Sequence, residues 1–225
     1  MSDLQRTDEW FNARLGKVTA SRIADVCART KSGWGAARKN YMAELVAERL
    51  TGERVEGFTN AAMQWGTDME PEARIAYEFY RDVSVVECGF IPHPTIAETG
   101  ASPDGLVGDD GLVEIKCPNT ATHLETLLGS NLPEKYFLQM QWQMACTGRQ
   151  WCDFASYDPR LPESMRLYVD RVKRDDDAIK AIERDVADFL NELRDTVHAL
   201  RKRYEPESID TSPLQNRLVQ SVMVG

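Results

Sequence analysis

Apolar residues recur three and four positions apart over several segments of this chain, the spacing that predicts amphipathic helices. The longest such segment, 176–204, carries one apolar stripe made of Ile179, Ile182, Val186, Phe189, Leu190, Leu193, Val197 and Leu200. Further helices are predicted over 8–15, 19–28, 40–50, 65–82 and 134–148. The long stripe is expected to cover one face of a sheet, with a coiled-coil contact as the alternative.

Strands are predicted where short runs of β-branched and apolar residues replace the helical spacing, at 83–86, 89–91, 151–157 and 165–172. Helices therefore come first, then strands, a helix, strands and a last helix. This order predicts an α/β (α+β) fold in which a mixed central β-sheet is flanked by helices. Residues 1–204 are expected to form one domain. The weakly patterned tail, 205–225, is expected to be weakly ordered or to be an interaction extension.

A hairpin predicted between these strands brings charged residues together. Asp104 lies on its first strand, and Glu114 and Lys116 lie two positions apart on its second. Because side chains alternate between the two faces of a strand, Glu114 and Lys116 share one face.

The register of this hairpin decides whether Asp104 joins them. A three-residue loop at 108–110 would pair Val107 with Gly111 and set Asp104 opposite Glu114. A slip of one residue would turn Asp104 to the other face.

The composition, 42% hydrophobic and 28% charged, is ordinary for a globular protein. No uncharged apolar run is long enough to span a membrane, and the N-terminus lacks a secretion pattern, so a cytoplasmic location is expected. The five cysteines include no C-x-x-C pair and are expected to be reduced thiols. The three scattered histidines are interpreted as structural or surface residues.

The net charge of −9 argues against nucleic-acid binding, but the charge is uneven. Residues 5–40 hold eight Lys or Arg against three Asp or Glu. An enclosed basic groove with an acidic exterior would fit both observations, because nonspecific DNA binding needs local positive charge.

Asp104 and Glu114 offer the oxygen ligands that Mg²⁺ or Mn²⁺ prefers. Lys116 beside them would orient or deprotonate an attacking water, or neutralise charge developing on a phosphate. Such a site suits metal-assisted phosphodiester cleavage. The alternative is a Pro-Asp-Gly turn beside an ordinary edge strand. Apolar residues around the carboxylates favour the site, because unpaired buried charges are costly.

Two further sets of polar residues have a structural and a functional interpretation. Glu70 is either a third carboxylate or the end of a capping box that begins at Thr67. Gln139 shares a helix face with Tyr136 and Gln143, and that face either contacts a phosphate or metal-bound water or is merely solvated. The residues alone favour the structural interpretation of both sets.

Arg14, Ser21 and Ser102 would form a pocket for a phosphate at the N-terminus of the second helix. The alternative, an N-cap serine beside a surface arginine, is favoured by spacing alone.

Six motifs follow one another along the chain: Trp10-Phe11 through Gly16, Thr19-Ala20-Ser21, Trp65-Gly66 with Glu70, Ser102 to Leu106, Glu114 to Pro118, and Tyr136-x-x-Gln139-x-Gln141. In these motifs the chain resembles the phage lambda exonuclease family, the viral recombinase alkaline exonucleases of the PD-(D/E)xK nuclease superfamily. The resemblance runs from about Asp8 to Tyr204 and implies a restriction-endonuclease-like fold.

The resemblance implies a Mg²⁺-dependent 5′-to-3′ exonuclease that processively degrades the 5′-phosphorylated strand from ends of duplex DNA. The remaining 3′ single strands would serve homologous recombination by single-strand annealing. Mn²⁺ is the alternative ion, and two ions per active site are expected. The alternatives are a PD-(D/E)xK endonuclease or repair nuclease, and a non-catalytic DNA-binding relative.

Residue by residue, the resemblance makes Asp104, Glu114 and Glu70 metal ligands, Lys116 the catalytic lysine and Gln139 an active-site glutamine. It assigns the 5′-phosphate to the pocket of Arg14, Ser21 and Ser102. It therefore reverses the structural interpretations favoured above for Glu70, for Gln139 and for this pocket.

DNA contacts are expected from the basic loop and from two other places. Lys31 aligns with an arginine of the family, and Arg29 is a possible substitute, since lysine lacks the planar fork of arginine. Met63 is expected to wedge between base pairs, and Tyr136 and Gln141 complete the predicted contacts.

The resemblance also implies partners. A ring-shaped homotrimer would enclose DNA, and a single-strand annealing protein would load on the product strand. The host compartment would be the cytoplasm of a bacterium, with the chain encoded by the bacterium or a prophage.

Overall fold

The computed structural model describes residues 4–31, 33–55, 61–129 and 131–205, so the predicted tail lies outside the described residues from position 206. Its main sheet has the strand order β10-β9-β8-β7-β4. Among the described strands of this sheet, β8 and β9 are parallel and the other neighbouring pairs are antiparallel. The strands are β4 (Val85–Val86), β7 (Gly105–Val107), β8 (Gly111–Lys116), β9 (Trp151–Tyr157) and β10 (Leu167–Lys173). The predicted mixed central sheet is confirmed.

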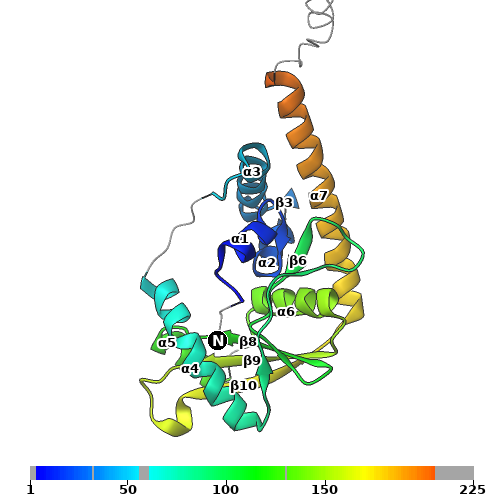
Figure 1. Cartoon of the computed structure of the whole chain (residues 1–225). Helices are drawn as coiled ribbons and strands as arrows, with labels where there is room; N and C mark the ends of the chain where they lie inside the picture. The colour runs from blue at the N-terminus through cyan, green and yellow to red at the C-terminus, as the bar shows by residue number, and fades with distance from the viewer. Residues whose placement is uncertain (1–3, 32, 56–60, 130, 206–225) are drawn as a thin grey trace, which may run out of the picture.

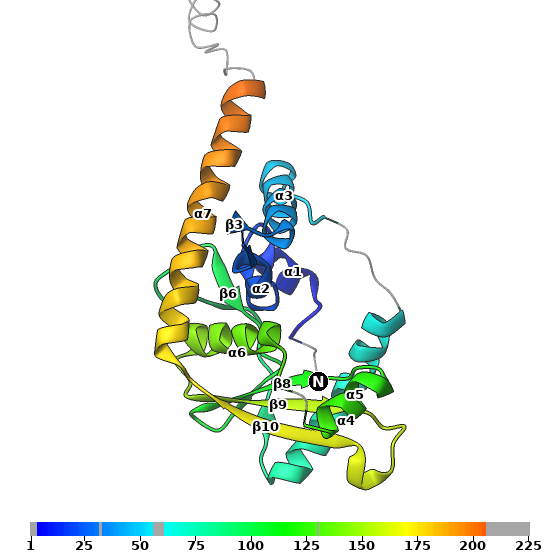
Figure 2. The ribbon, with the colours of Figure 1, turned by 180° about the vertical axis from the view of Figure 1, so that it is seen from behind.

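Helices cover both faces of this sheet (Figures 1 and 2). On one face, α4 (Ala61–Arg81) packs Ala73 and Tyr77 against residues of β7, β8 and β9. On the other face, α6 (Glu134–Thr147) packs Met140 and Met144 against Leu112, Cys152 and Phe154. Any side chain of β8 that points toward α6 is therefore enclosed between the sheet and that helix.

A helical layer lies beyond α6. It consists of α1 (Asp8–Arg14), α2 (Ile23–Val26), α3 (Ala36–Thr51) and α7 (Asp176–Tyr204). The apolar stripe of α7 packs into one core with Tyr41, Leu45 and Trp142. Figure 1 shows α7 rising beside α6 and α3, on the opposite side of the molecule from α4. The stripe thus covers the helical layer and not the sheet itself, which corrects the expectation from the sequence.

Short elements complete the fold. A second sheet has the order β1-β6-β5, from β1 (Val18–Thr19), β5 (Ile91–Pro92) and β6 (Thr99–Ala101). The remaining elements are the hairpin of β2 (Arg29–Thr30) and β3 (Gly33–Trp34), helix α5 (Thr120–Leu127), and two 3₁₀ turns, Ala20–Arg22 and Glu163–Met165. The sequence predicted a basic loop where β2 and β3 lie, and it predicted neither β1, β6 nor α5.

The start of α4 removes one interpretation of Glu70. The helix begins at Ala61, so Thr67 lies inside it and donates a hydrogen bond to the carbonyl of Met63, 3.2 Å away. A capping box at this position is therefore wrong, because the backbone N–H groups of residues 67–70 already lie within a helix.

The hairpin of β7 and β8 has the register that places the charged residues together. Val107 pairs with Gly111 and Gly105 pairs with Val113, which leaves the predicted three-residue loop at 108–110. Gly108 has φ of +53°, the left-handed conformation that glycine adopts without strain.

All five cysteines are free thiols, as expected. His123 is buried and contacts Ser156 Oγ and the carbonyl of Met165, which fits the structural role predicted for it. Within the described residues, no helix combines the length and the apolar character needed to cross a membrane.

Candidate active site

Glu114 is the centre of the candidate site. It lies on β8 with its side chain toward α6 and is only 1% exposed. Its Oε1 accepts hydrogen bonds from Gln139 Nε2, 2.6 Å away, and from Lys116 Nζ. Its Oε2 accepts from Gln143 Nε2, also 2.6 Å away. The alternation predicted for β8 is confirmed, since Val113 and Ile115 belong to the core on the α4 side.

Asp104 lies where the two strands of the hairpin separate. Pairing ends at Gly105, and the N–H of Ile115 donates to Asp104 Oδ2 at 2.7 Å. Burial raises the pKa of Asp104 well above its usual range, and the nearby charges of Glu114 and Glu70 raise it further. The charge of Glu114 therefore acts on Asp104, and the hairpin has the register that was predicted to set these two residues opposite each other.

Lys116 supplies the positive charge of the site. Its Nζ contacts Glu114 Oε1 and lies 5.2 Å from the centre of the Tyr136 ring. Burial acts to lower the pKa of this ammonium, but the charges of Glu114 and Asp104 outweigh burial and raise it. The side chain is therefore held as a cation beside two carboxylates.

Glu70 is held differently from the other predicted metal ligands. Its Oε2 lies 2.6 Å from Arg6 Nη2, and its Oε1 lies 3.1 Å from Arg74 Nη2. In the part of the chain that the structure describes, no group of three or more His, Cys, Asp or Glu side chains is arranged to hold a metal ion. The charge of Glu70 therefore raises the pKa of Asp104, while Glu70 itself is paired with two arginines.

The site has the donor set that a hard divalent cation takes. Among the described residues, no hydrogen bond reaches Asp104 Oδ1, and Glu114 Oε1 faces Lys116 and the partly exposed Gln139. Repulsion between these carboxylates is the strain that a bound cation would relieve. Asp104 and Glu114 are thus the residues that fit a metal ion.

A basic pocket borders the carboxylates through Ser102, two residues before Asp104. Ser102 Oγ accepts hydrogen bonds from Arg14 Nη1 at 3.1 Å and from Trp10 Nε1 at 3.0 Å. The Arg14 guanidinium also stacks 4.1 Å over the Trp10 ring. Arg14 and Ser102 are therefore brought together as the resemblance implied, and Trp10 fixes both.

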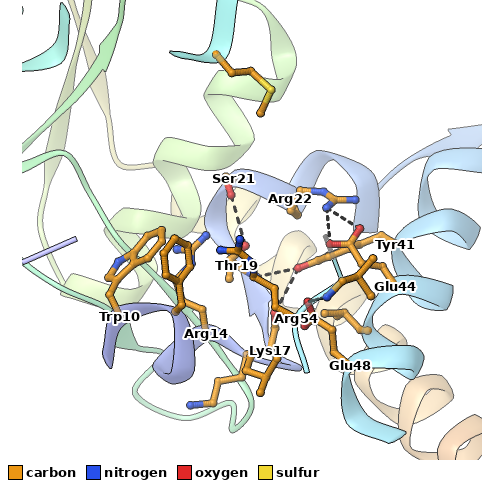
Figure 3. Close-up of a pocket in the computed structure, with 15 residues that line it drawn as sticks. Trp10, Arg14, Lys17, Thr19, Ser21, Arg22, Tyr41, Glu44, Glu48 and Arg54 are labelled. Carbon is orange, nitrogen blue, oxygen red and sulfur yellow. Dashed lines mark hydrogen bonds and ion pairs between the residues drawn. The ribbon is translucent and has the colours of Figure 1, made fainter. Parts of the chain in front are cut away.

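The cavity beside Arg14 has a volume of about 340 Å³, and Ser21 and Thr19 are in its wall (Figure 3). Ser21 Oγ lies 3.4 Å from Thr19 Oγ1. Burial lowers the pKa of Arg14 to about 10, and Tyr41 and Glu48 act in the opposite direction. Arg14 remains charged at neutral pH, as an anion-binding residue must.

The predicted DNA contacts lie at three places. Met63 lines the cavity of Arg14 and is 56% exposed. Arg29 pairs with Asp185 at 2.6 Å and stacks over Trp34, and Lys31 is exposed in the adjoining turn. Tyr136 stacks on Phe154, with its ring near Lys116.

Gln141 does not fit the DNA contact predicted for it. The side chain is fully buried and links α6 to the segment that follows β10. Its Nε2 donates to the carbonyl of Lys173 at 2.8 Å, and its Oε1 accepts from the N–H of Asp175 at 2.9 Å. Both ends of the amide are occupied by the backbone, so Gln141 is a structural residue.

Three contacts were not predicted as parts of the site. Gln143 binds Glu114, Trp10 binds Ser102, and Arg6 binds Glu70. Gln143 had a detectable signal, because it lies four residues after Gln139 and so on the same helix face. Arg6 had none, and Trp10 had only its place in a family motif, since their partners are more than 60 residues away along the chain.

Comparison with known proteins shows which proteins this chain is similar to. Residues 9–150 match the family model described as the YqaJ-like viral recombinase domain. The chain is 56% identical to an alkaline exonuclease, LHK-Exo, from Laribacter hongkongensis, with a TM-score of 0.82 over 88% of this chain and 97% of that one. A structure of LHK-Exo in complex with dAMP matches equally well.

Two more distant proteins are also similar. A phage-related exonuclease from Haemophilus somnus 129PT shares the fold, with a TM-score of 0.64 at 15% identity over 82% of this chain and 96% of that one. The uncharacterized protein R354 of Acanthamoeba polyphaga mimivirus is 27% identical over an alignment of 163 residues that covers 67% of this chain. The match spans only 28% of R354.

The fold is therefore that of the phage-related exonucleases of the PD-(D/E)xK type. Because the family model covers more than half of the chain, the chain belongs to the YqaJ-like viral recombinase family.

Proposed function

We propose that this chain is a divalent-metal-dependent deoxyribonuclease that degrades duplex DNA from its ends in the 5′-to-3′ direction. Residues 1–204 would form its single nuclease domain. The observation that carries the proposal is the adjacency of two sites: Ser102 binds Arg14, and Asp104 lies two residues further on, beside Glu114. A cationic pocket thus borders the carboxylates.

The pocket supports the proposed direction of digestion. A terminal 5′-phosphate has two negative charges near neutral pH, and a partly buried arginine with a fixed guanidinium plane binds such a group strongly. With the phosphate held by Arg14, the next phosphodiester along the strand would lie over Asp104 and Glu114. Cleavage there releases a 5′-mononucleotide, and dAMP is a molecule of that class seen bound to LHK-Exo.

Asp104 and Glu114 would hold Mg²⁺ or Mn²⁺, which when bound polarises the phosphate and lowers the pKa of an attacking water. The ammonium of Lys116 lies beside Glu114, where it stabilises negative charge that develops on the phosphate. Gln139 is within reach to orient a water molecule or a phosphate oxygen. Glu70 would join a second ion if its ion pairs with Arg6 and Arg74 open.

The direct test is digestion of a linear duplex and of a closed circular duplex of the same sequence, each with Mg²⁺ or with a chelator. We expect Mg²⁺-dependent loss of the linear DNA only. The Lys116→Ala variant should lose at least about 100-fold in rate, the scale of removing one charge-stabilising donor, while still binding duplex ends. Nicking of the circle would identify an endonuclease instead, and binding without cleavage a non-catalytic relative.

The Lys135→Ala variant is a matched control. Lys135 also lies beside the Tyr136 ring, 4.7 Å from its centre, but it belongs to the first turn of α6 and contacts neither carboxylate among the described interactions. Equal losses in both variants would contradict the role of Lys116.

We further propose that the enzyme acts as a ring-shaped homotrimer on DNA ends, and that a single-strand annealing protein takes up the remaining 3′ strand. Both proposals rest on the resemblance to the phage lambda exonuclease family. A closed ring would keep the enzyme on one strand for many cycles, because dissociation would require an interface to open.

A further inference from the structure

Gln143 is a buried polar side chain that the mechanism above does not use. It is fully buried on α6, and its Nε2 donates to Glu114 Oε2 at 2.6 Å. Gln139, one helical turn earlier, donates to the other oxygen, Oε1, at the same distance. Two glutamines of one helix thus bind the two oxygens of a single carboxylate.

The two oxygens differ in access. Oε1 is on the side of Lys116 and Gln139, whose side chains are partly exposed. Oε2 is on the side of Gln143, which has no exposure to solvent. A cation that enters from solvent therefore meets Oε1 first, and Oε2 stays enclosed by protein.

A third element contacts the Gln143 amide. Cys152 of β9 is fully buried, and its Sγ lies 3.9 Å from Gln143 Oε1 and also 3.9 Å from the carbonyl oxygen of Asp153, so its one S–H has two acceptors and can donate to the amide oxygen. Burial raises the pKa of this thiol well above its usual range, so it stays protonated and able to donate. Because a carboxylate accepts only, this contact directs the amide Nε2 toward Glu114.

We propose that Gln143 is a positioning residue for the metal site. Its hydrogen bond to Oε2 orients the Glu114 carboxylate so that Oε1 binds the divalent cation. The hydrogen bond from Gln139 to Oε1 breaks when the cation binds. This inference rests on the proposed metal-dependent function. The polar groups around a metal ligand typically affect metal affinity 10- to 100-fold when they are removed.

The test measures binding of Mn²⁺ alone to the full chain by calorimetry, without DNA. Methionine matches the length of glutamine but cannot donate, so Gln143→Met, Gln139→Met and Gln141→Met form a matched set on one helix. Gln143→Met should weaken Mn²⁺ binding at least about tenfold. Gln139→Met should bind Mn²⁺ at least as tightly as wild type, because its hydrogen bond competes with the cation.

Gln141→Met controls for damage to the fold. It removes two hydrogen bonds from an equally buried glutamine that faces Lys173 and Asp175, so it should lower the melting temperature. Its Mn²⁺ affinity should stay within about twofold of wild type, since it is not coupled to the site. Equal losses of Mn²⁺ affinity in Gln141→Met and Gln143→Met would overturn the inference.

Cys152 provides a second test that leaves Gln143 in place. Cys152→Ser keeps a donor for the amide and should retain Mn²⁺ affinity, whereas Cys152→Ala should weaken it. Unchanged affinity in both Gln143→Met and Cys152→Ala would contradict the positioning role. If the proposed metal-dependent function is itself wrong, Asp104→Asn should bind Mn²⁺ as wild type does. This result distinguishes failure of the proposed function from failure of the positioning role.

Discussion

At the scale of single residues, the site is defined by how each charge is balanced. Glu114 has three donors and Asp104 has one backbone donor, whereas Glu70 is paired with two arginines. Among the described contacts, Asp104 is therefore the carboxylate with the fewest partners, in keeping with its raised pKa, and its neighbour Ser102 contacts Arg14.

Arg14→Ala should separate phosphate recognition from chemistry. A charged hydrogen bond contributes about 1.5–3 kcal/mol, so loss of Arg14 should slow digestion of 5′-phosphorylated ends by about 10- to 100-fold. Ends with a 5′-hydroxyl should be digested at the wild-type rate for such ends. Initial rates on the two substrates measure this ratio.

Lys39→Ala is the control for a general loss of positive charge, because Lys39 is exposed on α3 and does not line the pocket. It should change both rates equally and slightly. Arg14→Ala acting equally on both kinds of end would contradict the phosphate pocket.

The arrangement of the charged hairpin residues could be predicted from the sequence, whereas several contacts of other site residues could not. Alternation along β8 determines that Glu114 and Lys116 share a face, and no distant contact is needed for this inference. The role of Gln141 was mistaken because the direction of a helical side chain depends on which face packs, and Gln141 turns toward β10 and α7.

At the scale of elements, the position of Asp104 depends on the close approach of β4 to β7. A Cβ added to Gly105 would lie 2.0 Å from Val85 Cγ1 and 3.2 Å from Val113 Cγ1. Only glycine therefore allows β4 to pair with β7 at this point, directly beside the site.

Gly105→Ala should destabilise the protein by about 1–3 kcal/mol, the usual cost of overpacking a core, and should lower nuclease activity by displacing Asp104. Urea denaturation measures the free energy of unfolding. Val85→Ala in the same chain should recover part of the loss, because it removes the clashing Cγ1.

Gly66→Ala is a control in which the expected change in stability has the opposite sign. Gly66 lies inside α4, and no atom of the described residues is within 4 Å of an added Cβ, so alanine should stabilise the protein by about 0.5–1 kcal/mol. A Gly105→Ala variant as stable as wild type would contradict the packing described here.

Long elements were predicted well, and short ones were not. The stripe of α7 and the strands β9 and β10 carry enough residues to show their period. The strands β1 and β6 have two and three residues and exist through tertiary pairing, including the parallel contact of Val18 with Thr99. A local pattern cannot reveal such strands.

At the scale of the whole molecule, the sequence predicted a basic N-terminal region within an acidic chain. In the structure, Arg22, Arg29 and Arg38 of that region form ion pairs with carboxylates of α2, α3 and α7. Part of the positive charge counted from the sequence is therefore neutralised within the folded chain, and the pocket of Arg14 becomes the more specific feature behind the proposed DNA contact.

If the enzyme is a closed trimeric ring, it should have a single oligomeric state. Light scattering of the full chain should give three times the 25.5 kDa mass of one chain at all concentrations used for activity. Digestion in the presence of excess competitor DNA, added after the start, should continue on the first substrate. A monomer that transfers at once to the competitor would contradict the ring.

The central claim is that Arg14 and the two carboxylates together select and cut the 5′-phosphorylated strand. The most direct measurement is digestion of a duplex with one 5′-phosphorylated and one 5′-hydroxyl end, with each strand labelled separately and Mg²⁺ present. We expect rapid loss of the 5′-phosphorylated strand while its complement stays intact. Loss of both strands at equal rates, or shortening from the 3′ ends, would contradict it.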